Sequence, residues 1–343
     1  MNPPKKLITF CVPSYNSEEY LHYALDSLRG HEEAEVLIID DGSKDKTLEI
    51  AKKYEAEYPA IFKAVHQENK GHGGAINTAI SLATGEYFKV LDSDDWVDQD
   101  AYDKLIEFLK GQGEENKADL ILMDYVYQVG RGNPDTRIGF SYYFPDDQTI
   151  LLKDMRFHMR IQDNVTLHSA IYRLEVIRES GVVLPEHCSY EDNYFVYAPL
   201  GYVQRVRYIC APLYQYLIGR DGQSMAHENL IRKYHDFILC GELTFNAHDI
   251  MKFRKTDKKR YRIMRHHLIL GMLFLNMFPQ LNGTPEALEE MRQAMLRCQQ
   301  NNPAQYKMIR RPARVSFFYH RGKPAKKFAH FLYDFAHKFV HFN

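Results

Sequence analysis

Three aspartates lie within four residues in the sequence LDSDDW, at Asp92, Asp94 and Asp95. Because a single residue separates Asp92 from Asp94, a turn can direct one carboxylate to a hard divalent cation and the other to a sugar hydroxyl. Mg²⁺ or Mn²⁺ held by so few protein oxygens fills its coordination shell with water and substrate phosphate. The spacing therefore predicts a site for a nucleotide diphosphate whose charge the metal neutralises, so that a phosphate can leave. Asp95 extends this acidic edge, and we expect it to cap a helix.

Polar residues also follow the other apolar runs in the first third of the chain. They are Pro13, Ser14 and Tyr15 after the first run, Asp40 and Asp41 after the second, and Asp92, Ser93 and Asp94 after the third. Each of these residues alone is typical of a turn or a helix cap. Their shared position at the ends of apolar runs favours a ligand site instead.

The elements that must position these residues alternate in kind. Short, β-branched apolar runs closed by turn residues at 5–13, 34–43 and 86–95 predict buried parallel strands. Between them, residues 17–30, 44–58 and 73–85 have apolar positions at helical spacing. This order predicts an open α/β sheet, and ligands bind such sheets beyond the carboxyl ends of the strands.

Five segments of the chain carry a resemblance to a known family. CVPSYN, IIDDGSKDKT, NKGHGGAINTAI, ATGEYFKVLDSDDW and SYEDNYF occur in the order and spacing of family 2 glycosyltransferases with the GT-A fold. The chain resembles the bacterial surface-polysaccharide members of this family over roughly residues 5–225. The resemblance implies an α/β fold with a Rossmann-like mixed sheet, the GT-A fold of nucleotide-diphospho-sugar transferases. It also implies inverting transfer from a nucleotide diphosphate sugar, most often a UDP-sugar.

The resemblance implies roles for the residues at the strand ends. Pro13 and Tyr15 would shape the nucleobase slot. Asp41, with Asp40 beside it, would contact the base or the ribose.

The same resemblance divides the acidic edge between sugar and metal. Asp92 is similar in position to the family's ribose or sugar contact, Asp94 is similar to its ligand for Mn²⁺ or Mg²⁺, and Ser93 lies between them in the donor site. Trp96, the chain's one tryptophan, follows this edge. We expect Trp96 to pack in the core, with a platform for a sugar ring as the alternative.

The chain departs from the family pattern beside its glycine cluster. The resemblance places Asn69 and Gly71 along the nucleotide, but Ile76 stands where many members carry an arginine before the position of Asn77. The glycines of GHGG would let the backbone approach the ligand and present N–H groups to phosphate, with His72 as a further donor. A tight turn made for packing is the alternative.

Part of the phosphate binding is therefore expected from another segment. Arg220 and Ser224 flank a glycine-containing stretch in YQYLIGRDGQSM. It resembles the flexible segment that closes over the donor diphosphate in related transferases, and the planar guanidinium of arginine matches phosphate geometry. A surface turn is the alternative.

Inversion also requires a base, because an acceptor hydroxyl must attack the anomeric carbon from the face opposite the departing diphosphate. SYEDNYF supplies Glu191 and Asp192, and the family pattern makes Asp192 the base, with Glu191 orienting it or binding the acceptor. Repulsion between adjacent carboxylates is expected to raise one of their pKa values. Without the family, the two residues are typical of a stabilising charge pair at a helix N-terminus.

Composition narrows the remaining function classes. Lys and Arg total 44 against 45 Asp and Glu, so no overall positive field favours nucleic acid as a partner. The short N-terminal apolar run breaks at Pro13, and no apolar stretch reaches the ~18 residues of a membrane-spanning helix. The five cysteines show no CxxC spacing, which is typical of reduced thiols. We expect a cytoplasmic protein at the inner face of the membrane.

The pattern changes to helices after the segment of family resemblance, which predicts a catalytic domain at 1–225 and a helical region at 226–343. In the tail at 323–342, phenylalanines fall on one helical face and lysines on the other. Such a basic amphipathic helix can lie on an anionic membrane, where a lipid-linked acceptor would sit. Docking on the protein's own core, or on a second copy in a homo-oligomer, is the alternative.

Two function classes follow. The first is an inverting, metal-dependent glycosyltransferase that moves a sugar from a UDP-sugar to a hydroxyl of a cell-surface glycan, a teichoic-acid-like polymer or a lipid-linked acceptor. The second is a non-catalytic nucleotide-sugar-binding or assembly protein on the same fold. The presence of Asp92, Asp94 and Asp192 together favours catalysis, because a pure binder needs no base.

Overall fold

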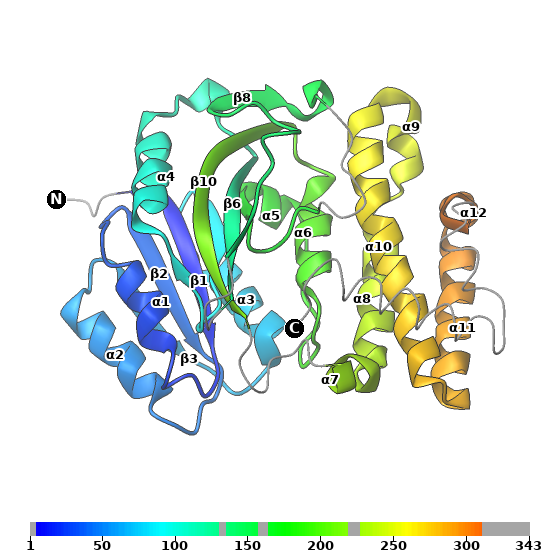
Figure 1. The fold of residues 1–343 in the computed structure, drawn as a ribbon, viewed down its shortest axis with the longest axis horizontal. Helices are drawn as coiled ribbons and strands as arrows, with labels where there is room; N and C mark the ends of the chain where they lie inside the picture. Colours follow the sequence, from blue (N-terminus) through cyan, green and yellow to red (C-terminus); the bar gives the residue numbers. More distant parts are fainter. Residues whose placement is uncertain (1–4, 130–134, 157–163, 219–226, 311–343) are drawn as a thin grey trace. The chain divides into compact units, whose positions relative to one another are not determined.

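The computed structural model, shown in Figure 1, describes residues 5–129, 135–156, 164–218 and 227–310. These residues form two compact units. The first unit holds residues 5–129, 135–156, 165–188 and 202–218, and the second holds residues 164, 189–201 and 227–310. Arg220, Ser224 and the predicted amphipathic tail at 323–342 lie outside the described residues.

A mixed sheet forms the centre of the first unit, with the strand order β3-β2-β1-β4-β9-β6-β10-β5. The strands β1 (Ile8–Ser14), β2 (Ala34–Asp40), β3 (Phe62–His66) and β4 (Tyr87–Val90) run parallel. Next to them, β9 (Ala170–Arg173) is antiparallel to both β4 and β6 (Leu120–Val129). The long β10 (Arg205–Ile218) runs parallel to β6 and antiparallel to β5 (Trp96–Val97). Two further strands, β7 (Thr136–Ile138) and β8 (Gln148–Leu151), pair with β6 and β10.

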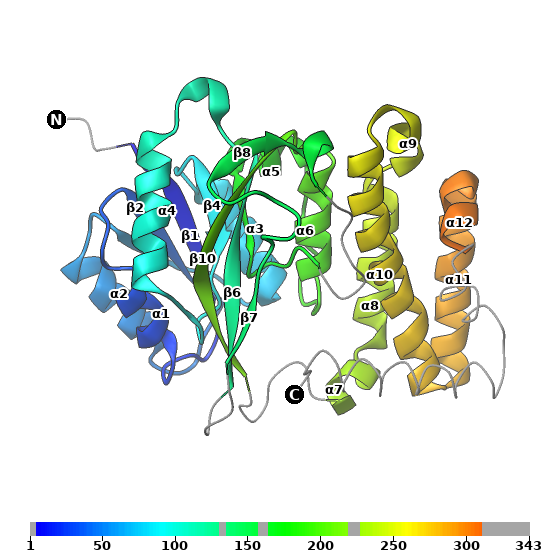
Figure 2. The ribbon, with the colours of Figure 1, turned by 45° about the horizontal axis from the view of Figure 1, so that its top comes forward.

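Helices cover both faces of the parallel strands, which explains why β1 and β4 are buried along their whole length, whereas the edge strand β3 is only partly buried. The side chains of Ile8, Phe10 and Val12 belong to one large core cluster with residues of α1 (Leu21–Ser27) and α4 (Gln99–Gly111). The helix α3 (Gly71–Leu82) packs on β1 and β2, α2 (Thr47–Glu57) packs on β2 and β3, and α5 (Leu174–Ser180) packs on β9. Figure 2 shows α4 lying alongside the strands. The predicted alternating α/β sheet is confirmed.

The second unit is helical. It contains α6 (Asp192–Leu200), α7 (His227–Arg232), α8 (Tyr234–Ala247), α9 (Phe253–Thr256), α10 (Lys258–Asn282), α11 (Pro285–Asn301) and α12 (Pro303–Arg310). The long α10 begins after Asp257, whose side chain accepts from the Arg260 amide, and ends at Gly283 with φ +72°. The predicted helical C-terminal region is confirmed. Among the helices of the described ranges, none is long and apolar enough to cross a bilayer.

Candidate active site

The carboxyl ends of the first three strands lie side by side. Ser14 of β1 pairs with Asp40 of β2, and Asp40 pairs in turn with His66 of β3. The Asp40 side chain is fully buried, and its Oδ2 lies 2.6 Å from Nδ1 of the half-exposed His66. The Ser43 amide donates to Asp40 Oδ1 at 3.3 Å. Asp40 therefore holds the turn that follows β2 and presents the His66 ring at the strand ends.

Asp41 connects the end of β2 to the start of α3. Its Oδ1 accepts hydrogen bonds from Gln67 Nε2 at 2.7 Å and from the Lys70 amide at 2.9 Å, and its Oδ2 accepts from the Gly71 amide at 2.8 Å. Its main-chain carbonyl accepts from Asn69 Nδ2 at 2.9 Å. A carboxylate that accepts backbone amides at a helix start stabilises that start. Asn69 and Gly71, which were predicted to lie along the nucleotide, are thus both hydrogen-bonded to Asp41.

Position 71 requires glycine because of its backbone conformation and a close backbone contact. Its φ is +75°, and a Cβ at this position would lie 2.9 Å from the His187 amide nitrogen. The His187 amide donates to the Lys70 carbonyl at 2.8 Å, so two chain segments pass each other closely at this point. At Gly71 the group that approaches closely is the backbone of His187, as the alternative of a tight turn made for packing predicts. The approach of a ligand to the glycine cluster stays a prediction.

The acidic loop begins where β4 ends, after Leu91, whose amide donates to the Cys11 carbonyl. Asp92 Oδ1 lies 3.0 Å from His72 Nε2, and its Oδ2 lies 3.1 Å from the Tyr214 hydroxyl. Burial alone would raise the pKa of Asp92, but the hydrogen bond and charge of His72 outweigh burial and lower this pKa to about 2. Asp92 is therefore ionised at neutral pH. His72, expected as a donor to phosphate, donates to this carboxylate.

Asp95 is a buried anchor for β10. Its Oδ2 lies 2.6 Å from the Tyr214 hydroxyl, and its Oδ1 accepts from the Leu217 amide at 2.9 Å. Burial, and then the charge of Asp92, raise the pKa of the Asp95 carboxyl. The expectation that Asp95 caps a helix is wrong, because the cap of α4 is Asp98, which accepts from the Ala101 amide at 3.0 Å.

A buried lysine lies beneath this loop. Lys89 of β4 donates through Nζ to the carbonyls of Leu167 at 2.6 Å and His168 at 2.7 Å, and Nζ lies 4.9 Å from the centre of the Tyr214 ring. Burial lowers the pKa of Lys89 to about 7, although the charges of Asp92 and Asp95 act in the opposite direction. The sequence interpretation missed Lys89 and Tyr214. The only signal was a lone cation within an apolar strand, since Tyr214 lies 122 residues beyond Asp92.

The other strand-end residues occupy the same edge. Pro13 is buried in β1, and Tyr15 directly after this strand is 50% exposed. Their contact with the nucleobase stays a prediction. Ser93 Oγ lies 2.8 Å from Ser17 Oγ, which joins the acidic loop to the segment after β1. Asp94 is partly exposed between Ser93 and the buried Asp95. An ionisable, accessible carboxylate suits Mg²⁺ or Mn²⁺, which prefer oxygen ligands.

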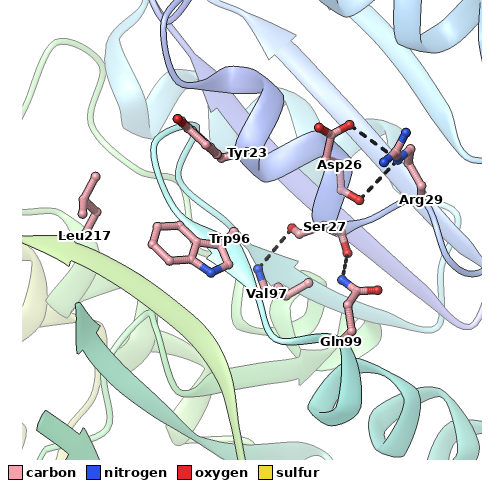
Figure 3. Close-up of a pocket in the computed structure, with 8 residues that line it drawn as sticks. All are labelled: Tyr23, Asp26, Ser27, Arg29, Trp96, Val97, Gln99 and Leu217. Carbon is pink, nitrogen blue, oxygen red and sulfur yellow. Dashed lines mark hydrogen bonds and ion pairs between the residues drawn. The ribbon is translucent and has the colours of Figure 1, made fainter. Parts of the chain in front are cut away.

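Trp96 does not pack in the core. Its partly exposed ring lines an open groove of about 750 Å³, together with Tyr23, Asp26, Ser27, Arg29, Val97, Gln99 and Leu217 (Figure 3). Three of the lining residues are joined by hydrogen bonds: the Val97 amide donates to Ser27 Oγ at 3.1 Å, and Gln99 Nε2 donates to the Ser27 carbonyl at 2.6 Å. None of the predicted site residues lines this groove.

The two carboxylates predicted to supply the catalytic base, Glu191 and Asp192, belong to the second unit. Asp192 is the first residue of α6, and Glu191 occupies the N-cap position with its side chain buried. The Phe195 amide donates to the Glu191 carbonyl at 2.9 Å, which closes the first turn of α6. The pair therefore stands at a helix start, as its sequence indicates. A carboxylate in the first turn is also favoured by the helix dipole.

Comparison with known sequences matches this chain to glycosyltransferases. Residues 9–175 match the family described as "Glycosyl transferase family 2". The chain is 31% identical over 222 residues to the putative glycosyltransferase EpsH of Bacillus subtilis, which covers 62% of this chain and 60% of that protein. It is 27% identical over 270 residues to a poly(ribitol-phosphate) beta-glucosyltransferase of Bacillus spizizenii, which covers 76% of this chain and 40% of that protein. The chain thus spans 60% or less of the length of these two curated relatives.

A solved structure shares the fold. The crystal structure of TarS 1–349 from Staphylococcus aureus in complex with UDP-GlcNAc matches with a TM-score of 0.61. The match covers 94% of this chain and 88% of that chain, at 22% sequence identity. At this identity the match establishes the GT-A fold.

Proposed function

We propose that this chain, whose residues 9–175 match glycosyl transferase family 2, is an inverting, metal-dependent glycosyltransferase. The proposed reaction moves a sugar from a UDP-sugar to a hydroxyl of a cell-surface glycan, a teichoic-acid-like polymer or a lipid-linked acceptor. The UDP moiety is supported by the fold shared with TarS, which binds UDP-GlcNAc. The polymer acceptor is supported by the relative that acts on poly(ribitol-phosphate).

The acidic loop after β4 is the observation that carries this proposal. Asp92 is ionised and fixed in place by His72 and Tyr214, while Asp94 beside it is partly exposed. In the proposed complex, Asp92 accepts hydrogen bonds from the donor's ribose or sugar, and Asp94 holds Mn²⁺ or Mg²⁺. The ion, when bound, neutralises the diphosphate that leaves.

The chain's own residues supply binding and proton removal. Tyr15 and the turn after β2 would contact the nucleoside. Asp192 would accept the proton of the acceptor hydroxyl as that oxygen attacks the anomeric carbon, while the bond from this carbon to the diphosphate breaks. Glu191, buried at the N-cap of α6, would orient Asp192 or bind the acceptor.

A panel of UDP-sugars with Mn²⁺ or Mg²⁺ tests the donor assignment. We expect at least one UDP-sugar to raise the melting temperature in the presence of metal, because a ligand that binds the native state stabilises it. The same donor should release UDP faster when poly(ribitol-phosphate) or a lipid-linked glycan is added. Asp94→Ala should abolish the metal-dependent stabilisation, whereas the control Asp100→Ala, at an exposed aspartate of α4, should retain it. If no UDP-sugar binds with either metal, or if both variants behave alike, the donor site is assigned wrongly.

A further inference from the structure

In the segment that precedes α6, the amide, the hydroxyl and the carbonyl of Ser189 all contact residues at or near the start of α8. The Ser189 amide donates to Asp236 Oδ2 at 3.0 Å. Ser189 Oγ accepts from Lys233 Nζ at 2.6 Å, and the Ser189 carbonyl lies 3.8 Å from Cys240 Sγ, within the range of a thiol hydrogen bond. The first turns of α8 therefore hold every polar group of Ser189.

The next residue is tied to the same helix by its ring. Tyr190 stacks on Phe237 of α8 with ring centres 4.1 Å apart and planes 10° apart. Phe237 stacks in turn on Phe278 of α10, with centres 3.9 Å and planes 17° apart. Both phenylalanines are buried, so Tyr190 forms the outer end of an aromatic stack that begins in the helical core.

Tyr190 also has a strained backbone. Its φ is +68°, in the left-handed region that residues with a large side chain rarely adopt. Such a conformation persists only where the surrounding contacts determine it, and the stack on Phe237 of α8 is one of these contacts. Glu191 and Asp192 follow directly, so the direction in which the chain enters α6 is set at Tyr190.

We propose that Tyr190, held by Phe237 of α8, is a positioning residue for the base Asp192. The inference rests on the proposed function, and it gives the helical unit a part in the reaction. A base acts only within hydrogen-bond distance of the proton that it removes, and small displacements of a reacting group cost rate steeply. Loosening the stack moves Asp192 without changing its chemistry.

Two matched leucine variants test this role. Phe237→Leu keeps an apolar side chain but removes the ring that Tyr190 stacks on, and Phe245→Leu makes the same change at a second buried position, near the C-terminal end of α8. We expect Phe237→Leu to lower kcat about tenfold or more, with the KM for the UDP-sugar within about twofold. Phe245→Leu should keep kcat within about twofold although its melting temperature falls. Tyr190→Ala should lower kcat as Phe237→Leu does. Tyr190→Phe, which keeps the stack, should retain the wild-type kcat.

Hydrogen exchange gives a readout that does not depend on turnover. The amides of residues 189–195 should exchange faster in Phe237→Leu than in Phe245→Leu. Equal kcat and equal exchange in the two leucine variants, or wild-type kcat in Tyr190→Ala, would overturn the inference. A wild-type protein that transfers no sugar would instead refute the proposed function, and the exchange comparison would then decide alone whether α8 fixes this segment.

Discussion

At the scale of single residues, the three aspartates of LDSDDW have three different environments. Asp92 is ionised between His72 and Tyr214, Asp95 is buried against Tyr214 and the Leu217 amide, and Asp94 is partly exposed. A concentration of negative charge at a strand end is therefore balanced mostly by the protein itself. The proposal assigns the metal to the partly exposed Asp94.

Tyr214→Phe tests this arrangement. The phenol carries one proton for two carboxylates, so its removal should lower the free energy of unfolding by about 1–3 kcal/mol. The variant should also bind the UDP-sugar more weakly, because Asp92 loses one of the groups that fix it. Urea unfolding and titration calorimetry measure the two effects.

Tyr208→Phe is the matched control. Tyr208 lies on the same strand, is fully buried, and donates to Asp124 Oδ1 at 2.7 Å, away from the acidic loop. The Tyr208→Phe variant should lose a similar free energy of unfolding and keep the wild-type affinity for the UDP-sugar. Equal donor affinities in the two variants would show that Tyr214 serves stability alone.

Part of the candidate site could be predicted from the sequence. The acidic loop, the strand-end turns and the helix start at Asp192 are local features, because turn residues directly follow apolar runs. The hydroxyl that joins Asp92 to Asp95 could not be predicted, since it comes from the distant strand β10. Asp95 was misassigned for the same reason: its partners are remote, whereas the cap of α4 lies three residues farther along at Asp98.

At the scale of elements, the approach of β1 to the start of β4 leaves no room for a side chain at Gly85. The Gly85 amide donates to Thr9 Oγ1 at 2.9 Å, and an added Cβ would lie 2.4 Å from the Thr9 amide nitrogen. The neighbouring atoms belong to a central strand and cannot move aside. The contact lies just before β4, the strand that pairs with β1 and leads into the acidic loop.

Gly85→Ala should therefore lower the free energy of unfolding by about 1–3 kcal/mol, as overpacking in a core does. Gly111→Ala is the control, because the added Cβ at this last residue of α4 meets nothing within 4 Å beyond its own stretch of helix. It should be neutral or stabilise the protein by up to ~1 kcal/mol, from the higher helix propensity of alanine. Denaturant unfolding of both variants measures this difference, and similar values for the two would contradict the predicted clash.

The alternating half of the fold was predictable and the rest of the sheet was not. The parallel strands and the helices between them follow from apolar runs and helical spacing. The strand β10 contains Pro212, where its register with β6 shifts, and a proline within a run argues against a central strand. The antiparallel β9 is four residues long and gains its place only through pairing with β4 and β6.

At the scale of the whole molecule, the proposal assigns donor binding to the first unit and proton removal to Asp192 of the second unit. The family match covers residues 9–175, so the assignment of Asp192 rests on its sequence motif and its place at the start of α6. The affinity for the donor and the rate of sugar transfer can therefore be changed separately. A variant at Asp192 should lower the rate of sugar transfer and leave the affinity for the donor unchanged.

The most direct measurement is the rate of UDP release by the wild type and Asp192→Asn, with Mn²⁺, saturating UDP-sugar and acceptor. Asparagine has nearly the same shape as aspartate but cannot accept the proton, so kcat should fall by about 10²–10⁴-fold. The dissociation constant of the donor should stay within about twofold of the wild-type value. Release of UDP by Asp192→Asn at the wild-type rate would contradict the account.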